Sequence, residues 1–306
     1  MNTKNKKLRL ELTSAGIEAS YPVTVFDEFG KTMETHITGE RPLTLYIDKQ
    51  EIVTLMTLGK NPELLVIGYL YNQGFIKKTE DLKSVQVDWD IESAVVLTRG
   101  GISNLEKRLE KRTVTSGCGQ GTVFGDMLED LDKIKLNSPV LRQSSFYRLL
   151  KNIREYNEVY KKSGAVHGCA LCKDEKIEIF IEDVGRHNAA DAIAGYMLLE
   201  QIDGSNKLFY TTGRLTSEMV IKVAQMGIPI LFSRAGITKM GLELSQKLGV
   251  TTISRAAGKH FLVYNGVETV IYDAKPSEKT NSRFNSSGGS EESPLHERRR
   301  GSKLST

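Results

Sequence analysis

The sequence predicts an α/β protein, α+β overall, in which a three-layer domain with a mixed sheet follows a smaller α+β domain. Two observations support this prediction. From residue 166 onward, short apolar runs alternate with segments of helical period, which is typical of a sheet with a largely parallel centre and antiparallel edges. Before residue 136, short strand candidates surround one well-marked helix.

Length and composition fit one large or two small soluble domains. The chain has 306 residues, of which 39% are hydrophobic and 26% are charged. No stretch approaches the roughly 18 apolar residues of a membrane span, and the basic start lacks the apolar core of a secretory signal. Three cysteines are too few for a disulfide framework, so we expect a cytoplasmic protein with reduced thiols.

The expected division is an N-terminal α+β domain over 1–135, an α/β domain over 136–274 and a tail over 275–306. The tail is rich in serine, glycine and charged residues and has almost no aliphatic ones, so we expect it to be disordered. Its three consecutive arginines at 298–300 would make few phosphate contacts. We therefore expect neither nucleic acid nor a membrane as a partner.

In the N-terminal part, strands are expected over 8–12, 21–26, 43–47, 85–87 and 94–97. Asn61, Pro62 and Glu63 are a helix start signal, with a cap residue, a proline at the first helical position and an acidic first turn. The helix that they open is expected to end at Gly74. Residues 112–126 contain four glycines without a helical period, which predicts a loop, and loops commonly hold reactive groups.

In the C-terminal part, apolar residues at helical spacing predict one long helix over 141–160. Two strand candidates over 166–171 and 177–181 follow it as a hairpin. The remaining strands are expected over 208–212, 229–233, 250–254, 261–264 and 267–272. The helices between the strands are expected over 189–201, 216–226 and 238–248.

Cys118 is the most suggestive residue for chemistry. It lies between Gly117 and Gly119 in the predicted loop, where few side chains cover the backbone amides. A reactive cysteine must be accessible in a setting that stabilises its thiolate, because the thiolate is the nucleophile. The residues alone leave two alternatives open, a functional cysteine and an ordinary loop cysteine.

Cys169 and Cys172 follow His167 in a C-x-x-C pattern that invites comparison with zinc sites. If this segment is a strand, residues three apart point to opposite faces, which argues against shared ligation. The H-x-E motif of zinc deaminases is also absent from the sequence. We therefore expect no metal ligands here and interpret both cysteines as buried strand residues.

Two predicted strand ends carry arginines. A strand-to-helix connection that is dense in polar groups holds Arg186 and His187, and Arg214 follows the next strand. Open α/β sheets bind ligands at the carboxyl ends of their strands, and arginine beside a helix N-terminus suits a phosphate. An alternative of equal weight is an internal ion-pair network, in which Glu182 and Asp183 pair with the two arginines.

With these motifs, the sequence resembles the formate dehydrogenase accessory sulfurtransferases of the FdhD type. The similarity runs over most of residues 40–270. The matching segments are GYLYNQGFI (68–76), SGCG (116–119), SGAVHGCAL (163–171), EDVGRHNAADAIAGYML (182–198), TTGRLTSEMVIKVAQMGIPILFSRAGIT (211–238) and GKHFLVYNG (258–266). The tail from residue 275 looks like an addition outside the family.

The resemblance implies that the chain is a sulfurtransferase that carries sulfur, as a persulfide on a loop cysteine, from a cysteine desulfurase. The recipient would be the molybdenum or tungsten bis-guanine-dinucleotide cofactor that formate dehydrogenase requires, bound here as cargo. The implied partners are the desulfurase and the catalytic subunit of formate dehydrogenase, with a homodimer left open. The implied fold of the C-terminal domain is similar to that of cytidine deaminases, without their zinc chemistry.

By this resemblance, Cys118 is the persulfide carrier, and Gly121 stands where the family has a second cysteine. The guanine-dinucleotide segment of the family matches Phe261, Leu262, Val263, Tyr264, Asn265 and Gly266. On a strand, Phe261 and Tyr264 point opposite ways, so only one of them can stack on a given base. Weaker candidates for binding the cofactor, through its phosphates, are Arg186, His187 and Arg214.

Two other functions stay open. The first is a non-catalytic chaperone that binds the same cofactor or the enzyme, with Gly121 marking the loss of sulfur transfer. The second is a zinc enzyme of the nucleoside-deaminase type, which bound zinc near one ion per chain would reveal. The sequence does not distinguish molybdenum from tungsten or identify the formate dehydrogenase that is served.

Overall fold

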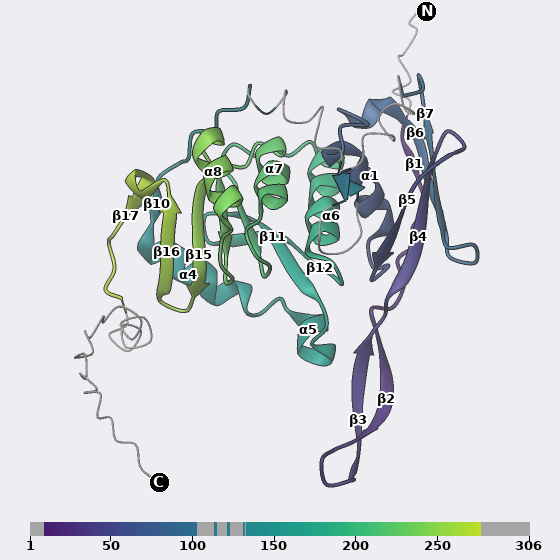
Figure 1. The fold of residues 1–306 in the computed structure, drawn as a ribbon, viewed down its shortest axis with the longest axis horizontal. Coiled ribbons are helices and arrows are strands. Elements are labelled where there is room, and N and C mark those ends of the chain that lie inside the picture. The colour runs from purple at the N-terminus through teal and green to yellow at the C-terminus, as the bar shows by residue number, and fades with distance from the viewer. Residues whose placement is uncertain (1–8, 103–112, 115–120, 123–130, 132, 277–306) are drawn as a thin grey trace, which may run out of the picture. The chain divides into compact units, whose positions relative to one another are not determined.

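The computed structural model describes residues 9–102, 113–114, 121–122, 131 and 133–276 (Figure 1). The chain divides into two units, Met1–Ala274 and Lys275–Thr306, and every element below belongs to the first. Apart from its first two residues, the predicted disordered tail lies outside the described residues. The domain boundary at residue 135 stays a prediction. No helix in the described part of the chain is long and apolar enough to cross a membrane.

The N-terminal part is built around a five-stranded sheet with the strand order β1-β6-β7-β4-β5. Its strands are β1 (Glu11–Leu12), β4 (Arg41–Ile47), β5 (Gln50–Thr57), β6 (Leu82–Asp88) and β7 (Ser93–Thr98). A separate antiparallel ribbon is formed by β2 (Ser20–Phe26) and β3 (Thr32–Thr38). Helix α1 (Pro62–Asn72) begins at the predicted proline, and the 3-10 turn η1 (Thr79–Asp81) leads into β6.

Two strands of this part, β3 and β5, were not among the predicted elements. The apolar residues Met33 and Ile37 of β3 are half exposed, so this strand lacks a buried alternation. In β5, the pairing with β4 shifts at a bulge, so that Val53 lies opposite Leu45 and Glu51 lies opposite Tyr46, with Ile52 as the extra residue between them. The buried residues Ile52 and Leu55 are therefore three positions apart instead of two, and the pattern of period two fails.

Six strands of the C-terminal part form one mixed sheet with the order β12-β11-β13-β14-β15-β16. Its strands are β11 (His167–Lys173), β12 (Lys176–Asp183), β13 (Leu208–Thr211), β14 (Ile230–Ser233), β15 (Thr251–Ala257) and β16 (His260–Asn265). The pairs β13–β14 and β14–β15 are parallel, and the outer pairs are antiparallel. The predicted mixed sheet, with its parallel centre and antiparallel edges, is confirmed.

Helices cover both faces of this sheet (Figure 1). They are α4 (Gln143–Ile153), α6 (Arg186–Leu199), α7 (Ser217–Gln225) and α8 (Lys239–Leu248). Leu171 faces the core that contains apolar residues of α6, α7 and α8, whereas its neighbour Ala170 faces the core beneath α4. The α/β character is therefore confirmed, and the likeness to the layers of cytidine deaminases stays a prediction.

The single helix predicted over 141–160 is wrong, because the structure has two helices there, α4 and α5 (Glu158–Ser163). The carboxylate oxygens of Glu182 on β12 accept hydrogen bonds of 2.9 Å from the backbone N–H groups of Val159 and Tyr160. In a continuous helix these amides would bond to carbonyls four residues earlier. A contact from a distant strand therefore separates α5 from α4.

Three smaller predictions are also corrected. Helix α6 begins at Arg186, three residues before its predicted start. Gly266, with a φ of 79°, ends β16, so the strand predicted over 267–272 is instead the 3-10 turn η2 (Val267–Thr269) followed by β17 (Val270–Ile271). Strand β17 pairs with β10 (Leu141–Arg142). Within the predicted loop over 112–126, β8 (Thr113–Val114) and β9 (Gly121–Thr122) form an antiparallel pair.

Helices α1 and α6 cross at two glycines, and this crossing joins the N-terminal and C-terminal parts of the unit. A methyl group added at Gly68 of α1 would lie 1.6 Å from the carbonyl oxygen of Asp191 on α6. One added at Gly195 of α6 would lie 2.0 Å from the carbonyl oxygen of Leu64. Because only glycine permits such an approach, these two positions set the helix separation.

Candidate functional site

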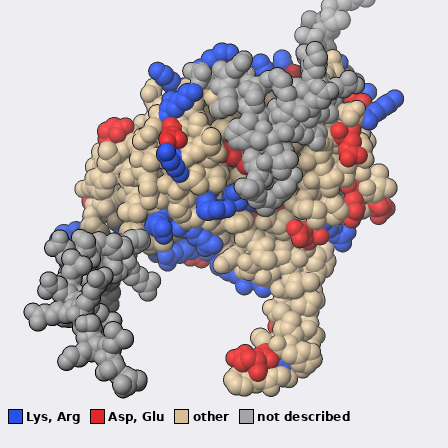
Figure 2. All heavy atoms as spheres, in the orientation of Figure 1, with Lys and Arg blue, Asp and Glu red and all other residues tan. Residues whose placement is uncertain are grey.

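The carboxyl ends of β12, β13 and β14 lie at one edge of the sheet, because these strands run in the same direction. Arg186, Arg214 and Arg234 follow the three strand ends, one after each, and we call this region the arginine edge. Lys and Arg side chains gather along this side of the sheet, below α6 and α7 in the view of Figure 2. Arg234 was not predicted, although the rule of strand ends applies equally to it.

Arg186 lies against the backbone of the neighbouring strand end. A methyl group added at Gly213 would be 2.3 Å from Cδ of Arg186, so the arginine stem fills the space that a side chain there would need. In the described part of the chain, the buried Nε of Arg186 has no hydrogen-bond acceptor. A buried donor without an acceptor is costly, and an anionic ligand would satisfy it with a charge-assisted hydrogen bond.

His167, at the start of β11, lies beside the same strand end. Its Nδ1 is 3.1 Å from Oγ1 of Thr212, and that oxygen also accepts a hydrogen bond of 3.1 Å from the N–H of Gly168. Burial lowers the pKa of His167, and the positive charges of Arg186 and Arg234 lower it further. The imidazole is therefore neutral at pH 7 and lies within electrostatic reach of both arginines.

Glu182 and Asp183 have partners away from the arginine edge. The Glu182 carboxylate binds the first amides of α5. Asp183 is buried and accepts hydrogen bonds from the side chains of Thr57 and Asn188, at 2.6 and 2.8 Å, and from two backbone amides. Among the described residues, no ion pair joins either carboxylate to an arginine of the edge. The structure therefore does not support the internal ion-pair alternative.

His187 is buried between α6 and α7. Its Nε2 is 3.2 Å from Oε2 of Glu218. Burial lowers the pKa of His187 to about 2, and the nearby charges of Lys222 and Arg186 also lower it. The ring is therefore neutral at pH 7, and Nε2 is the ring nitrogen that faces the carboxylate. This arrangement gives His187 a partner within the helix layer, and its expected contact with a phosphate stays a prediction.

A buried ion pair that no sequence motif had indicated joins three helices. Nζ of Lys222 on α7 is 2.7 Å from both carboxylate oxygens of Asp191 on α6. The side-chain amide of Asn72 on α1 donates to the same carboxylate at 2.7 Å. We call these three residues the buried helix network. A lysine inside the apolar run MVIKVAQM is the sequence signal that could have revealed it.

Cys169 and Cys172 are buried strand residues, as predicted. Cys169 belongs to the core beneath α6 and Cys172 to the core beneath α4, so the two thiols face opposite sides of the sheet. Burial raises the pKa of Cys169 to about 12 and also raises the pKa of Cys172. Both thiols are therefore protonated at neutral pH and enclosed by protein, which makes them poor nucleophiles.

Cys118 lies outside the described residues. The paired strands β8 and β9 stand on either side of it in the sequence, with Thr113 opposite Thr122 and Val114 opposite Gly121. Cys118 falls in the connection between them, at residues 115–120. Its role as the persulfide carrier stays a prediction.

The predicted guanine-dinucleotide segment is β16 and the glycine after it. On the neighbouring strand, Leu262 lies opposite Ser254 and Asn265 lies opposite Thr252. Because β15 runs parallel to β14, the start of β16 lies at the arginine edge and its end lies at the opposite edge. The six residues of the segment are therefore spread along the length of β16 and do not form one compact site.

Several side chains of this segment already have partners. Phe261 packs edge-on against Phe146, with the ring centroids 5.2 Å apart. The side-chain amide of Asn265 donates to the carbonyl oxygen of Val250 at 2.8 Å. Tyr264 is 38% exposed, so its ring is the accessible aromatic face of the strand. Nucleotide binding by this segment stays a prediction.

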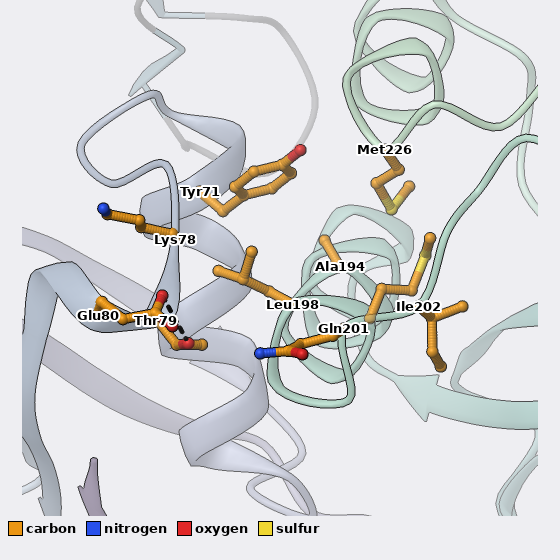
Figure 3. Close-up of a pocket in the computed structure, with 10 residues that line it drawn as sticks. Tyr71, Lys78, Thr79, Glu80, Ala194, Leu198, Gln201, Ile202 and Met226 are labelled. Atoms are coloured by element: carbon orange, nitrogen blue, oxygen red, sulfur yellow. Dashed lines mark hydrogen bonds between the residues drawn. The ribbon is translucent and has the colours of Figure 1, made fainter. Parts of the chain in front are cut away.

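A cavity of about 220 Å³ lies near the end of α6 (Figure 3). Met197, Ile202 and Met226 contribute an apolar lining, and Lys78 and Glu80 add charged side chains. The lining residues on α6 begin at Ala194, which at 1.5 Å per residue is about 12 Å along the helix from Arg186. The cavity and the arginine edge are therefore separate features, and none of the predicted site residues lines the cavity.

Comparisons with known proteins agree on one family. The FdhD/NarQ family model matches residues 38–271. The sulfur carrier protein FdhD of Bacillus pumilus is 32% identical over 230 residues, which cover 74% of this chain and 87% of that protein. The sulfur carrier protein FdhD of Wolinella succinogenes is 32% identical over 234 residues, which cover 76% and 81%.

A solved structure supports the same relationship. It is from Desulfotalea psychrophila and is described as that of a candidate formate dehydrogenase accessory protein. The two chains superpose with a TM-score of 0.68 at 28% sequence identity. The match covers 82% of this chain and 98% of the other, so the fold is shared over nearly the whole of that protein.

Proposed function

The chain belongs to the FdhD/NarQ family, and on that premise we propose that it is a cytoplasmic sulfurtransferase that serves a formate dehydrogenase. It takes sulfur from a cysteine desulfurase as a persulfide on Cys118. It then passes the sulfur to the molybdenum or tungsten bis-guanine-dinucleotide cofactor destined for the catalytic subunit of formate dehydrogenase. The cofactor is cargo in this proposal, not a resident group.

The loading step is a thiol exchange at one sulfur atom. The Cys118 thiolate attacks the outer sulfur of a persulfide on the desulfurase. A new S–S bond forms on Cys118, the S–S bond of the desulfurase breaks, and its cysteine leaves as a thiolate. The step needs no external oxidant or reductant, because the sulfane sulfur keeps its oxidation state.

The observation that carries the proposal is the contrast among the three cysteines of the chain. Cys169 and Cys172 are fully buried and have raised pKa values, so neither can meet a partner protein. Cys118 is the remaining thiol, and it lies within the family match between glycines. A sulfur carrier must expose a thiolate, and this condition leaves Cys118 as the candidate.

The arginine edge supports the cargo half of the proposal. Arg186 and Arg214 follow the ends of β12 and β13 near helix N-termini. The diphosphate of a dinucleotide would gain charge-assisted hydrogen bonds at Arg186 and long-range attraction from Arg214. The unpartnered Nε of Arg186 fits such an anion. Tyr264, toward the other end of β16, offers an exposed aromatic face for a guanine of the extended dinucleotide. We therefore expect binding of GDP in preference to ADP, and equal affinities in calorimetric titration would refute the base-recognition part.

A chaperone without sulfur transfer is the second candidate, and Gly121 is the observation that favours it. A second thiol at this position could assist release of the sulfur, and glycine cannot. One thiolate is chemically sufficient to accept and release a sulfane sulfur. The two candidates therefore differ in whether Cys118 is required.

Complementation separates the two candidates. The chain is expressed in a strain that lacks its own protein of this family, and formate dehydrogenase activity is measured. We expect the wild type to restore activity, Cys118→Ser to abolish it and Cys172→Ser to retain it. Full activity of Cys118→Ser would favour the chaperone, and failure of the wild type with its own formate dehydrogenase present would refute the proposed function.

A further inference from the structure

We propose that His167, Arg186 and Arg234 form one oxyanion subsite around Gly213, which binds a phosphate group, and that Arg214 lies outside it. This inference deepens the cargo half of the proposed function by naming the residues that hold a phosphate. It is independent of the sulfur chemistry, because phosphate binding is measurable without a desulfurase or a metal.

The geometry that supports it is the meeting of three strand ends at residues 212–213. Oγ1 of Thr212 is 3.1 Å from Nδ1 of His167, which connects β11 to the end of β13. The stem of Arg186, at the start of α6, lies over Gly213. Oγ of Ser233, the residue before Arg234, donates to the carbonyl oxygen of Gly213 at 2.6 Å. The imidazole, the stem of Arg186 and the residue before Arg234 therefore contact one short segment of backbone, residues 212–213.

His167 can donate from its second ring nitrogen. In a neutral imidazole one nitrogen carries the proton and the other accepts. Oγ1 of Thr212 accepts a hydrogen bond from the N–H of Gly168, so its own hydroxyl proton is free to be donated. The acceptor within hydrogen-bond distance of that hydroxyl is Nδ1 of His167. We assign that proton to the Oγ1–H···Nδ1 bond, which places the ring proton on Nε2. The half-buried ring then presents an N–H donor within electrostatic reach of two guanidinium groups.

The charge balance of this corner favours an anion. Arg186 carries a buried Nε without an acceptor among the described residues. Arg234 is exposed, and its guanidinium lies 5.2 Å from the ring centroid of Tyr160, which limits its rotation. The nearest carboxylates in sequence, Glu182 and Asp183, are buried and hydrogen-bonded to other groups. Within the described part of the chain, neither arginine therefore forms an ion pair with a carboxylate.

Arg214 differs from the other two arginines. It also follows a strand end, but the stem of Arg186 packs over Gly213 and the guanidinium of Arg234 is held against the ring of Tyr160, whereas no side-chain hydrogen bond, ion pair or ring contact of Arg214 is found among the described residues. Its side chain is exposed and makes no ion pair within the described residues. We therefore place Arg214 at the rim, where it contributes long-range attraction and little to a bound phosphate.

The test is calorimetric titration of the full chain with inorganic diphosphate, GDP and guanosine. Loss of one charged hydrogen bond weakens binding by about tenfold or more. We expect that loss for diphosphate and GDP in Arg186→Gln, Arg234→Gln and His167→Leu. His167→Gln keeps a donor and should retain part of the affinity. Guanosine, which lacks a phosphate, should bind equally to all variants.

Two further variants serve as controls. Arg214→Gln should weaken diphosphate by less than about threefold, as expected of a rim charge. Arg148→Gln, which removes an exposed arginine of α4 that pairs with Glu175, should leave binding unchanged. The subsite is refuted if Arg214→Gln has the largest effect while His167→Leu and Arg234→Gln bind as wild type.

A second measurement needs no substitution, so it tests the subsite even where a variant fails to fold. The imidazole signals of His167 in the wild type are followed by NMR during addition of diphosphate. We expect them to shift and saturate with the calorimetric affinity, and unmoved signals would refute the subsite. Neither measurement depends on Cys118. The phosphate subsite can therefore be refuted while sulfur transfer is retained, and sulfur transfer can be refuted while phosphate binding is retained.

Discussion

The buried helix network and the arginine edge contain the same kinds of charged residues, yet they differ in whether those charges have partners. In the network, Lys222 binds both oxygens of Asp191, and Asn72 donates to the same carboxylate. At the edge, Arg186 and Arg234 both lie within electrostatic reach of His167, and neither forms an ion pair with a carboxylate among the described residues. The first arrangement holds helices together, and the second leaves positive charge available to a ligand.

Helix α6 contributes to both regions. Arg186 in its first turn belongs to the arginine edge, whereas Asp191 belongs to the network. One continuous motif, EDVGRHNAAD, therefore mixes residues that hold the fold with residues that face a ligand. The comparison teaches that partners in three dimensions, not membership of a motif, separate the two roles. The predictions below test this separation.

The largest expected effect is on the buried helix network. Lys222→Ala leaves the fully buried carboxylate of Asp191 without its cation, which should lower the free energy of unfolding by about 3–5 kcal/mol. Chemical denaturation measures the loss. The matched control is Lys239→Ala, which removes an exposed pair with Glu243 and should change little. Equal effects of the two variants would contradict a structural role for the network.

The glycine crossing beside the network should be nearly as sensitive. Gly68→Ala brings a methyl group to 1.6 Å from a carbonyl oxygen, so α1 and α6 must separate. We expect a loss of about 1–3 kcal/mol in the free energy of unfolding. Gly100→Ala is the control, because nothing lies within 4 Å of the added methyl group. A Gly68→Ala variant as stable as the control would show that the helices are not held this close.

The pH dependence of stability tests the buried histidine. The folded pKa of His187 lies far below its ordinary value of 6.5, so the unfolded chain binds the extra proton as the pH falls below 6.5. The contribution of neutral His187 to the free energy of unfolding is therefore fully present above pH 6.5. It decreases as the pH falls below 6.5, by at most about 1.4 kcal/mol per pH unit for one group. His187→Gln removes the titrating ring but keeps a polar side chain beside Glu218, so it should reduce this slope. An unchanged slope would mean that other groups cause the acid sensitivity.

The smallest expected effect on stability is at the arginine edge. Arg214→Gln removes an exposed charge that has no ion pair within the described residues, so the free energy of unfolding should change by no more than about 0.5 kcal/mol. Thermal and chemical denaturation both measure it. A loss well above that value would show that Arg214 supports the fold, and the comparison of the two regions would fail at this residue.

Much of the C-terminal sheet followed from the sequence, because its strands are short, apolar and separated by regular helices. The elements that the pattern missed depend on contacts from elsewhere. Helix α5 starts where Glu182 caps its amides, and β5 loses its alternation at a bulge beside Ile52. Local periodicity contains no information about either contact.

The candidate site was predictable only in part for a similar reason. Arg186 and Arg214 follow from the rule of strand ends, and the same rule applies to Arg234 once β14 is recognised. His167 was considered only as a metal ligand, because its position beside Thr212 depends on the antiparallel pairing of β11 with β13. The assignment of His187 to phosphate binding did not foresee its contact with Glu218.

The central claim is that Cys118 carries the sulfur, and mass spectrometry of the loaded protein tests it most directly. The chain is incubated with a cysteine desulfurase and cysteine, and the peptide spanning residues 112–126 is examined for one added sulfur atom. We predict the persulfide on Cys118 in the wild type and in Cys172→Ser, and none in Cys118→Ala. A persulfide confined to Cys169 or Cys172, or unchanged loading of Cys118→Ala, would contradict the claim.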